Sequence, residues 1–417
     1  MTTPAQHVVI VGAGLAGLRT LEQLRSSGFQ GRVTLIGDEP HPPYDRPPLS
    51  KQILHGTWEP HRAVLRDRRA LDELGVTVRL GARAVALHGT SVLLEDGDTV
   101  AGDALVLATG AVARRLPGQP AGAVTFRGLE DALALRRAFD SARSLVVVGA
   151  GFIGAEVAWA ARRRDIAVTV VESQQVPCAR VLGTEVGGLA GRLFTEAGVD
   201  LRCGAVVREL KDGHTVELAD GTVLSGDIVL VSVGAVPDLA WLNGALPLAQ
   251  GGVACDDGGR VDGVPGVWAV GDAAAWWDPV RAEHRRREHW TSAVDQASAV
   301  ACDLLGTPRP VATPPYVWSD QFGLKVQVLG DTDTADEVVE LHGAGLGGTT
   351  VKGTVAGYFT EGALSAVVSF GAPALAMRYR PLIASRAARD AVLAQAGRPV
   401  PTATRRSDQE AMEGPSA

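Results

Sequence analysis

The sequence has no pair of neighbouring cysteines and no recognisable metal-ligand spacing. Redox dithiols and cysteine-rich metal sites need two thiols within a few residues, as in CxxC or CxxxxC. The four cysteines are instead widely separated: Cys178, Cys203, Cys255 and Cys302. We therefore expect each to be a small apolar packing residue. His284, Glu288 and His289 have the residue types of a zinc-protease motif but not its spacing, so no metal site is expected.

Excess positive charge and long apolar runs are also missing. The chain has 40 basic and 47 acidic residues, a formal charge of −7, which argues against an obligate nucleic-acid binder but allows local basic patches. No apolar run is long enough to span a bilayer, and a strand pattern starts too close to the N-terminus to leave room for a signal peptide. We expect no membrane contact and a cytoplasmic location. With 417 residues, the chain should form two or three domains.

Glycine, in contrast, is abundant, with 50 residues concentrated at turns between strand-like and helix-like segments. The most informative stretch is 145–172, LVVVGAGFIGAEVAWAARRRDIAVTVVE. A valine-rich run leads into Gly149, Gly151 and Gly154, an alanine-rich helix pattern follows, and a second apolar run ends at Glu172. The first glycine allows a tight turn, the second lets a pyrophosphate approach the backbone, and the third lets helix and strand pack closely. This βαβ pattern predicts a dinucleotide site with the phosphates at the helix N-terminus.

A second copy of this fingerprint, VVIVGAGLAG, begins at Val8. Its glycines are Gly12, Gly14 and Gly17, its helix pattern runs to about Ser26, and the next strand is followed by Asp38 and Glu39. Either acid could bond a ribose hydroxyl, and the spacing favours Asp38. Two fingerprints predict two bound nucleotides.

The segments around the two fingerprints repeat as well. Two strands with a turn are expected over 76–100, before the buried strand LVLATG at 105–110, which contains Thr109 and Gly110. After the second fingerprint, a mixed segment again precedes an apolar strand, IVLVSVG at 228–234, which ends at Gly234. This internal repeat predicts an α/β chain in which one Rossmann-like dinucleotide-binding domain is inserted in another.

Two further segments carry polar residues at predicted turns. In PPYDRPPLSK, at 42–51, the prolines could hold Arg46 near phosphates and Lys51 near a ring system, or the segment could be a polar loop before a helix capped by Ser50. In VWAVGDA, at 267–273, a buried strand ends at Gly271 and Asp272. That acid could lie at a phosphate- or sugar-binding edge, or it could cap the helix that begins there.

The remainder of the chain has a different pattern. A basic strip at 281–287 precedes an alanine-rich helix that runs to about Leu305. Alternating apolar residues at 315–329 indicate antiparallel strands, and a helix is expected over 383–396. From residue 398 the sequence is rich in proline, threonine and charge without periodicity, so a disordered tail is expected.

Taken together, GAGLAG, PYDRPPLSK, ATG, GAGFIGAE, WAVGDAA, EHWTSAVDQA and WSDQFGLKVQ closely resemble the FAD-dependent NADH–ferredoxin and NADH–rubredoxin reductases that serve bacterial oxygenases and P450 systems. The resemblance covers nearly the whole chain. It implies an FAD domain formed by residues 1–113 and 247–318, an NADH domain at 114–246, and a C-terminal α+β interface domain at 319–397. Residues 398–417 would be the tail.

The resemblance also implies roles for individual residues. FAD would lie along the first fingerprint, with Asp38 or Glu39 at its ribose, and would contact Arg46, Lys51, Thr109, Gly110, Arg127, Gly271, Asp272 and Trp290. NADH would occupy the second fingerprint, Glu172 and Gly234. Lys51 and Glu156 would meet beside flavin and nicotinamide as the catalytic pair, although a plain buried ion pair between domains is the alternative. Whether Trp290 stacks or serves in docking stays open.

Cofactor choice and electron acceptor follow from nearby residues. The carboxylate of Glu172 would accept bonds from the ribose 2′-hydroxyl and repel a 2′-phosphate, and no arginine follows it, which favours NADH. Without a CxxxxC pair, electrons should pass directly from FAD to an iron–sulfur ferredoxin. Alternatives are a rubredoxin reductase, an NADH oxidase or an NADH-sensing redox-switch protein. Candidate docking residues, which could also be a solvated edge, are Arg281, Arg285, Arg286, Arg287, Arg378, Arg380 and Arg386.

Overall fold

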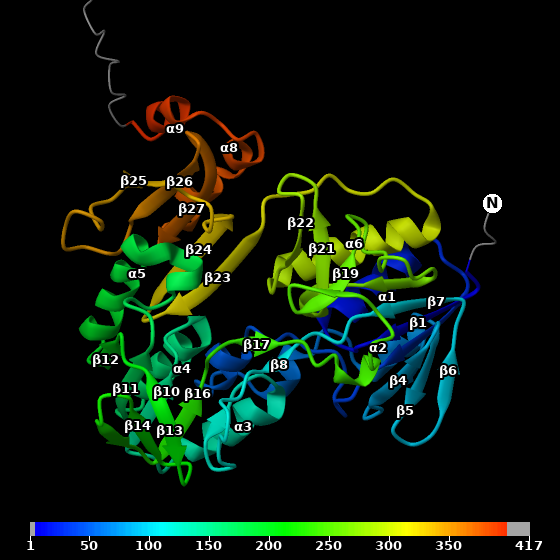
Figure 1. Cartoon of the computed structure of the whole chain (residues 1–417), viewed down its shortest axis with the longest axis horizontal. Coiled ribbons are helices and arrows are strands. Elements are labelled where there is room, and N and C mark those ends of the chain that lie inside the picture. Colours follow the sequence, from blue (N-terminus) through cyan, green and yellow to red (C-terminus); the bar gives the residue numbers. More distant parts are fainter. Residues whose placement is uncertain (1–4, 398–417) are drawn as a thin grey trace, which may run out of the picture.

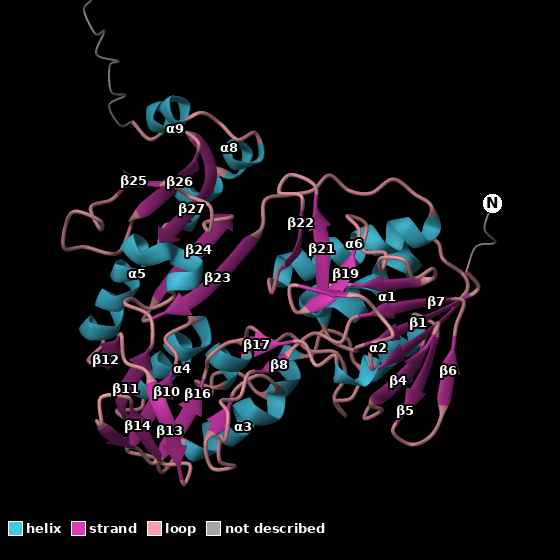
Figure 2. Ribbon diagram, in the orientation of Figure 1, coloured by secondary structure: helices cyan, strands magenta, loops and turns pink. Residues whose placement is uncertain are grey.

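The computed structural model describes residues 5–397, so the tail expected from residue 398 lies outside the described residues. The molecule has two lobes, with the N-terminal strands in one and strands β10–β16 in the other (Figure 1). The C-terminal strands and helices lie above the second lobe (Figure 2). Between residues 5 and 397, no helix combines the length and apolar character that a membrane crossing needs.

The first lobe is built on a five-stranded parallel sheet in the order β20-β7-β1-β2-β3. Strands β20, β7, β1 and β2 are short, mostly apolar and buried, as parallel strands generally are, whereas the edge strand β3 is more exposed. Helices α1 and α6 cover one face, and the antiparallel strands β4–β6 pack against the other. Where the sequence predicted two strands with a turn, over residues 76–100, the structure has four short strands, β3 to β6. The elements are β1 (His7–Val11), α1 (Leu15–Ser26), β2 (Arg32–Ile36), α2 (Arg68–Glu73), β3 (Thr77–Arg79), β4 (Ala84–His88), β5 (Ser91–Leu94), β6 (Thr99–Ala101), β7 (Ala104–Leu107), β20 (Val267–Ala269) and α6 (Trp290–Leu305).

The second lobe repeats this plan. Its parallel sheet has the order β12-β11-β10-β16-β9, and a three-stranded antiparallel sheet, β13-β14-β15, accompanies it. The repeat predicted from the sequence is thus a repeat of layers. The elements are β9 (Val124–Thr125), α3 (Leu129–Ala138), β10 (Ser144–Val148), α4 (Phe152–Arg162), β11 (Ala167–Glu172), α5 (Ala179–Glu196), β12 (Asp200–Cys203), β13 (Val207–Lys211), β14 (Thr215–Leu218), β15 (Val223–Ser225) and β16 (Ile228–Val231).

The chain passes between the lobes through two segments that pair with each other. Strand β8 (Val112–Ala113) and strand β17 (Ala235–Val236) form a two-stranded antiparallel ribbon, which lies between the lobes in Figure 1. After the return, a four-stranded sheet of order β18-β19-β21-β22 completes the first lobe. Its parts are η3 (Ala240–Leu242), β18 (Leu248–Ala249), β19 (Gly252–Cys255), β21 (Ala274–Asp278) and β22 (Glu283–Arg286).

The C-terminal part is an antiparallel sheet of order β23-β24-β27-β26-β25. Apolar residues of α5, among them Leu182 and Val186, pack against Val326 and Tyr358 of this sheet, which ties it to the second lobe. Strand β23 starts at Tyr316, so the boundary expected after residue 318 falls inside a strand. The elements are β23 (Tyr316–Gln321), β24 (Leu324–Gly330), β25 (Glu337–His342), β26 (Val355–Thr360), β27 (Ala363–Phe370), α7 (Pro373–Met377), α8 (Arg380–Ala384) and α9 (Arg389–Gln395).

The continuous helix predicted over 383–396 is wrong. The chain breaks after α8, Arg386 adopts a left-handed conformation with φ of 49°, and α9 begins three residues later. In the break, the carbonyl of Ala387 accepts a hydrogen bond from the Leu364 N–H, and Ala388 bridges to Ala363. Pairing with the start of β27 therefore overrides local helix preference.

Candidate functional site

A cavity of about 410 Å³ lies between the two lobes. Both parallel sheets contribute to it near the carboxyl ends of their strands, where ligands of such sheets bind. Most of the site residues expected from the sequence line it: Gly12, Gly14, Asp38, Glu39, Arg46, Lys51, Thr109, Gly110, Arg127, Glu156, Gly234, Gly271, Asp272 and Trp290. The remaining ones, Gly17, Gly149, Gly151, Gly154 and Glu172, lie outside its lining.

The two fingerprints have the same close-packed geometry. A Cβ atom on Gly12 would lie 2.0 Å from the carbonyl oxygen of Ala108, and one on Gly149 would lie 2.3 Å from that of Ser232. Both glycines also have positive φ, 117° and 104°, which side chains rarely adopt. A Cβ on Gly14 would meet no atom within 4 Å, and the same holds for Gly151. The middle glycine of each turn therefore faces open space, as approach of a phosphate to the backbone requires.

The third glycine of each turn lies where helix and strand touch. A Cβ on Gly17 would lie 1.9 Å from the Gly12 carbonyl oxygen, and one on Gly154 would lie 2.2 Å from that of Gly149. These residues set the packing of the turn and do not reach the cavity.

Charged side chains are paired across one end of the cavity. Arg127 binds the carboxylate of Asp272 at 2.6 Å, and Arg46 binds that of Glu39 at 2.7 Å. The other oxygen of Glu39 accepts a 2.5 Å hydrogen bond from Tyr44, and burial raises the pKa of this tyrosine above its usual value. Asp272 lies within a short 3₁₀ turn, η4 (Gly271–Ala273), and makes no side-chain capping bond there.

The two acids after β2 differ in environment. Asp38 is exposed at the cavity edge, whereas Glu39 is half-buried and held by Tyr44 and Arg46. Tyr44 was not predicted from the sequence as a site residue. Its hydroxyl also accepts the Leu129 N–H at 3.1 Å, which connects the first lobe with the start of α3.

Lys51 and Glu156 also meet in the lining of this cavity. The ammonium nitrogen of Lys51 lies 2.9 Å from Oε1 of Glu156, and the two side chains are 12% and 3% exposed. Lys51 belongs to a five-residue π-helical turn, η1 (Leu49–Ile53), and also donates to the Pro47 carbonyl at 3.3 Å. The sequence prediction that these residues approach each other agrees with this geometry. Ser50 lies inside η1 and donates its hydroxyl to Glu156, so it caps no helix.

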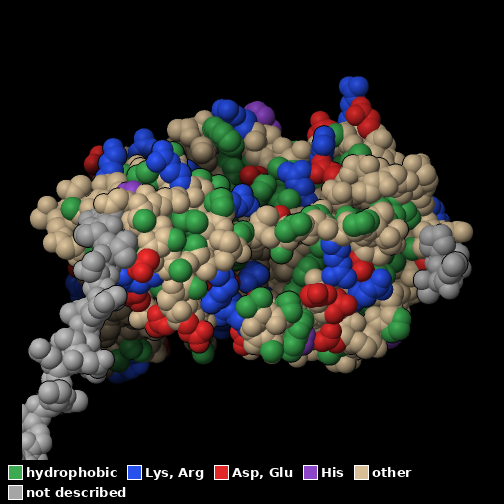
Figure 3. Space-filling model, turned by 90° about the horizontal axis from the view of Figure 1, so that it is seen from above, with side chains coloured by type: hydrophobic (Ala, Val, Ile, Leu, Met, Phe, Trp, Pro, Cys, Tyr) green, Lys and Arg blue, Asp and Glu red, His purple; other side chains and the backbone are tan. Residues whose placement is uncertain are grey.

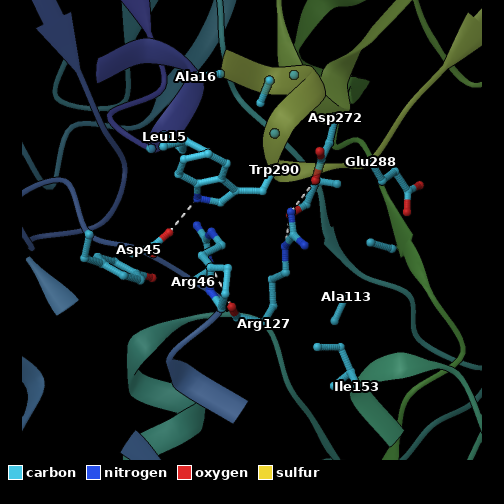
Figure 4. A pocket seen from close by; sticks show the side chains of 18 of the residues that line it. Leu15, Ala16, Asp45, Arg46, Ala113, Arg127, Ile153, Asp272, Glu288 and Trp290 are labelled. Carbon is cyan, nitrogen blue, oxygen red and sulfur yellow. Dashed lines mark hydrogen bonds and ion pairs between the residues drawn. The ribbon is translucent and has the colours of Figure 1, made fainter. Parts of the chain in front are cut away.

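Aromatic side chains lie between the cavity and the C-terminal sheet. Trp290, the first residue of α6, donates its indole N–H to Asp45 at 2.8 Å (Figure 4). Its ring lies edge-on to Trp318, with centroids 6.2 Å apart, and Trp318 stacks on Tyr316 at 5.5 Å. Burial raises the pKa of Asp45, while the Trp290 hydrogen bond opposes that shift. Neither Asp45 nor Trp318 was predicted as a site residue.

Glu172 is bound to the second fingerprint itself. One oxygen of its carboxylate accepts the Ala150 N–H at 2.8 Å and the other accepts the Gln174 N–H at 2.9 Å. The side chain is therefore fixed beside the glycine-rich turn, at the place predicted for a ribose-binding acid.

Residues 6–297 match the pyridine nucleotide-disulphide oxidoreductase family, and residues 316–400 match the reductase C-terminal family. The chain is 38% identical over 400 residues to the ferredoxin reductase component of chlorobenzene dioxygenase from Cupriavidus sp. (strain PS12), covering 92% of this chain and 94% of that protein.

The chain belongs to the pyridine nucleotide-disulphide oxidoreductase family. Solved structures agree. One chain of the covalent putidaredoxin reductase–putidaredoxin complex matches with a TM-score of 0.86 and 29% identity, covering 92% of this chain and 94% of that one. The ferredoxin reductase for the CYP199A2 system from Rhodopseudomonas palustris matches with a TM-score of 0.84 and 32% identity, covering 90% and 93%.

Members of this oxidoreductase family use FAD and NAD(P)H, and the cavity fits such a group. The hydroxyl oxygen of Thr109 is buried in the cavity lining and has no hydrogen-bond partner among residues 5–397. A buried polar atom of this kind calls for a partner, which a flavin or its phosphates would supply. Together with the open space at Gly14 and the paired arginines, this supports FAD binding in the first lobe.

This member of the oxidoreductase family has no disulphide. All four cysteines are free, three of them are buried, and burial raises the pKa of Cys178 to about 12, so its thiol stays protonated. Within the described residues, no cluster of three His, Cys, Asp or Glu side chains could hold a metal ion.

The basic strip expected as a docking surface is largely neutralised by acids of the same chain. Arg285 binds Asp333 at 2.6 Å, and Arg281 binds it at 3.1 Å. Arg287 binds Asp331 at 3.1 Å and Asp278 at 3.3 Å, while Arg286 pairs with Glu288. Lys and Arg side chains form separate groups with acids between them on the face shown in Figure 3. Through their pairs with Asp331 and Asp333, Arg281, Arg285 and Arg287 join β22 and its flanking residues to the turn after β24.

Proposed function

We propose that this protein is an NADH-dependent, FAD-containing reductase that passes electrons to an iron–sulfur ferredoxin serving a P450 or Rieske-type oxygenase. One observation carries the proposal: a single cavity is lined by both fingerprint lobes, and the Lys51–Glu156 pair joins them where the two ligands would meet. The relatives named above, ferredoxin reductases of a dioxygenase and a CYP system, support the acceptor class.

Each of the two cofactors is assigned to one lobe. We assign FAD to residues 1–113 and 247–318, NADH to residues 114–246, and the interface with the acceptor to the part that follows. Arg46, Arg127 and the first fingerprint would hold the phosphates of FAD, and Glu39 or Asp38 its ribose. The second fingerprint and Glu172 would hold NADH. The carboxylate of Glu172 disfavours a 2′-phosphate, so NADH is the preferred reductant.

The protein's contribution is placement and charge. When bound, FAD supplies a ring system that accepts the two electrons of a hydride and releases them singly. The ammonium group of Lys51 forms an ion pair with Glu156 at 2.9 Å and donates a hydrogen bond to the Pro47 carbonyl at 3.3 Å. Because Lys51 lines the cavity, its positive charge would stabilise negative charge that develops on a bound ligand during hydride transfer. Glu156 keeps the ammonium group in place.

The docking face for ferredoxin is assigned to the segment 378–386, which contains α8 and the residues on either side of it. Arg378 and Arg386 are exposed and Arg380 is half-buried, and none of the three forms an ion pair with any other part of the chain that the structure describes. Unpaired positive charge suits an acidic ferredoxin better than the neutralised strip at 281–287. NADH as reductant and four reduced cysteines fit a cytoplasmic location.

Stopped-flow reduction tests the proposal against its alternatives. Flavin bleaching by NADH within milliseconds to seconds, followed by cytochrome c reduction only when a ferredoxin is present, is the expected result. Rapid oxygen consumption without ferredoxin would identify an oxidase. Slow bleaching with a long-lived charge-transfer complex and dimerisation would identify a redox-switch protein, and efficient turnover with rubredoxin alone would identify a rubredoxin reductase.

A further inference from the structure

The carboxylate of Glu156 is a junction of three parts of the molecule. Glu156 itself belongs to α4 of the second lobe. Oε2 accepts the hydroxyl of Ser50 from the first lobe, and Oε1 accepts the hydroxyl of Ser319 from the C-terminal strand β23 at 2.5 Å. The backbone N–H of Asp320 also donates to Oε1, at 3.2 Å. With Lys51, four donors surround one carboxylate.

These donors leave the carboxylate little freedom. Oε1 contacts Ser319, the Asp320 N–H and Lys51, and Oε2 contacts Ser50, so both oxygens of the carboxylate are held. Ser50 and Ser319 are 1% and 0% exposed, so water cannot replace either hydroxyl without a rearrangement. The two serines lie 106 and 163 residues from Glu156 along the chain, so only tertiary structure brings them together.

We propose that Ser50 and Ser319 are positioning residues, which hold Glu156 in the one orientation that keeps Lys51 directed to the cavity. The inference rests on the proposed function, because the direction of Lys51 matters only if a ligand in the cavity interacts with its ammonium group. It also gives the C-terminal sheet a part in the NADH half of the reaction: β23 supplies two of the donors to Glu156.

The reasoning separates the two ends of NADH. Ser319 donates its hydroxyl to Glu156, whereas the adenosine end is assigned to Glu172, whose carboxylate is held by the N–H groups of Ala150 and Gln174. Removing the Ser319 hydroxyl should therefore disturb hydride transfer and leave adenosine binding intact. Misplacing a group at the reacting centre by about 1 Å can cost up to ~100-fold in rate.

The test uses the FAD-loaded full chain and the variants Ser319→Ala, Ser50→Ala and Ser319→Thr. Ser369→Ala is the matched control, since Ser369 is also 0% exposed and in the same sheet but bonds Gln327. Flavin reduction at saturating NADH should fall about 10-fold to 100-fold in both alanine variants. The dissociation constant for ADP-ribose, a fragment without nicotinamide, should stay within about two-fold of the original in all variants. Ser319→Thr, which keeps the hydroxyl, should recover most of the rate.

Two outcomes would overturn the inference. If Ser319→Ala lowers the unfolding temperature as Ser369→Ala does and leaves the reduction rate unchanged, Ser319 is only a packing residue. If the rate falls equally in Ser369→Ala, the loss reflects general loosening of the sheet. Failure of the original protein to bleach with NADH would instead contradict the proposed function, so the two failures are distinguishable.

Discussion

The carboxylate of Glu172 accepts a 2.8 Å hydrogen bond from the backbone N–H of Ala150, the residue between the first two glycines of the second fingerprint. The acid that is expected to bind a ribose is thus fixed to the turn that is expected to bind the pyrophosphate. Its position is set before any ligand arrives.

Glu172→Ala should weaken NADH binding by about ten-fold, as loss of a hydrogen bond to a charged group predicts, and should weaken NADPH less. Fluorescence titration with both nucleotides measures the preference. Asp200→Ala, on the neighbouring strand and paired with Arg202, is the control. An unchanged NADH/NADPH ratio in Glu172→Ala means that the ribose contact is wrongly assigned.

Breaking the Lys51–Glu156 pair from one side should be costly. Lys51→Met leaves a buried carboxylate without its cation, which should lower the free energy of unfolding by about 3–5 kcal/mol and slow flavin reduction. Adding Glu156→Gln should restore part of the stability but not the rate. Urea unfolding and stopped-flow absorbance measure the two quantities. Equal stability losses that simply add in the double variant would show that the two groups do not interact.

Substitution of the middle glycines should separate the two nucleotides. Gly14 and Gly151 have ordinary φ values of −83° and −75°, and an added methyl group meets no protein atom within 4 Å. Gly14→Ala should therefore fold but be purified with little FAD. Gly151→Ala should keep FAD and bind NADH about ten-fold more weakly, because the methyl group occupies the phosphate approach. Gly188→Ala, in helix α5 and also facing open space, is the control. Loss of FAD in both turn variants would contradict the assignment.

The two groups of arginines should respond differently to charge changes. Arg378→Glu together with Arg386→Glu should weaken ferredoxin binding, most strongly at low ionic strength where charges are least screened. Arg285→Gln should instead lower the unfolding temperature, since Arg285 binds Asp331 and Asp333 of the C-terminal part. Surface plasmon resonance at two salt concentrations and thermal unfolding are the measurements. The docking assignment fails if Arg285→Gln weakens ferredoxin binding more than the double variant does.

Acid should destabilise the contact between η1 and the end of α4. Burial lowers the pKa of His55 to about 4 from its ordinary 6.5, and the neighbouring charges of Arg163 and Arg164 act in the same direction. The unfolded chain then takes up a proton between pH 6.5 and 4 that the folded chain does not, so stability present above pH 6.5 declines as pH falls towards 4. Between pH 7.5 and 5 the original protein should lose roughly 1 kcal/mol more than His55→Gln, after allowance for solvent screening. His61→Gln, at an exposed histidine, should behave like the original.

The parts of the site that sequence could predict are those that depend on short spacing. Gly149, Gly151 and Glu172 lie within one βαβ unit, so turn geometry and chain length already bring them together. Ser50, Ser319 and Glu156 are separated by more than a hundred residues, and two serines in polar segments carry no signal that they share one carboxylate. Only the packing of three parts of the chain brings them into contact.

Distance along the sequence also explains where the structure differs from the sequence-based expectations. The predicted helix over 383–396 contains no glycine or proline that would announce a break, and the break arises from pairing with β27. From the sequence, the basic strip at 281–287 could be a docking surface or a solvated edge. Asp331 and Asp333, which neutralise it, lie almost fifty residues later. In both cases the deciding partner is distant in sequence.

The ribbon formed by β8 and β17 has a consequence for how such a chain could have been assembled. Ala113 lies opposite Ala235, and Val112 opposite Val236, so the chain leaves the first lobe and re-enters it at adjacent points. If relatives exchanged the intervening segment, both of its ends would have to fit at this one ribbon rather than at two distant sites. The lobe assigned to NADH could thereby be exchanged as a unit, while the lobe assigned to FAD keeps its own strand order.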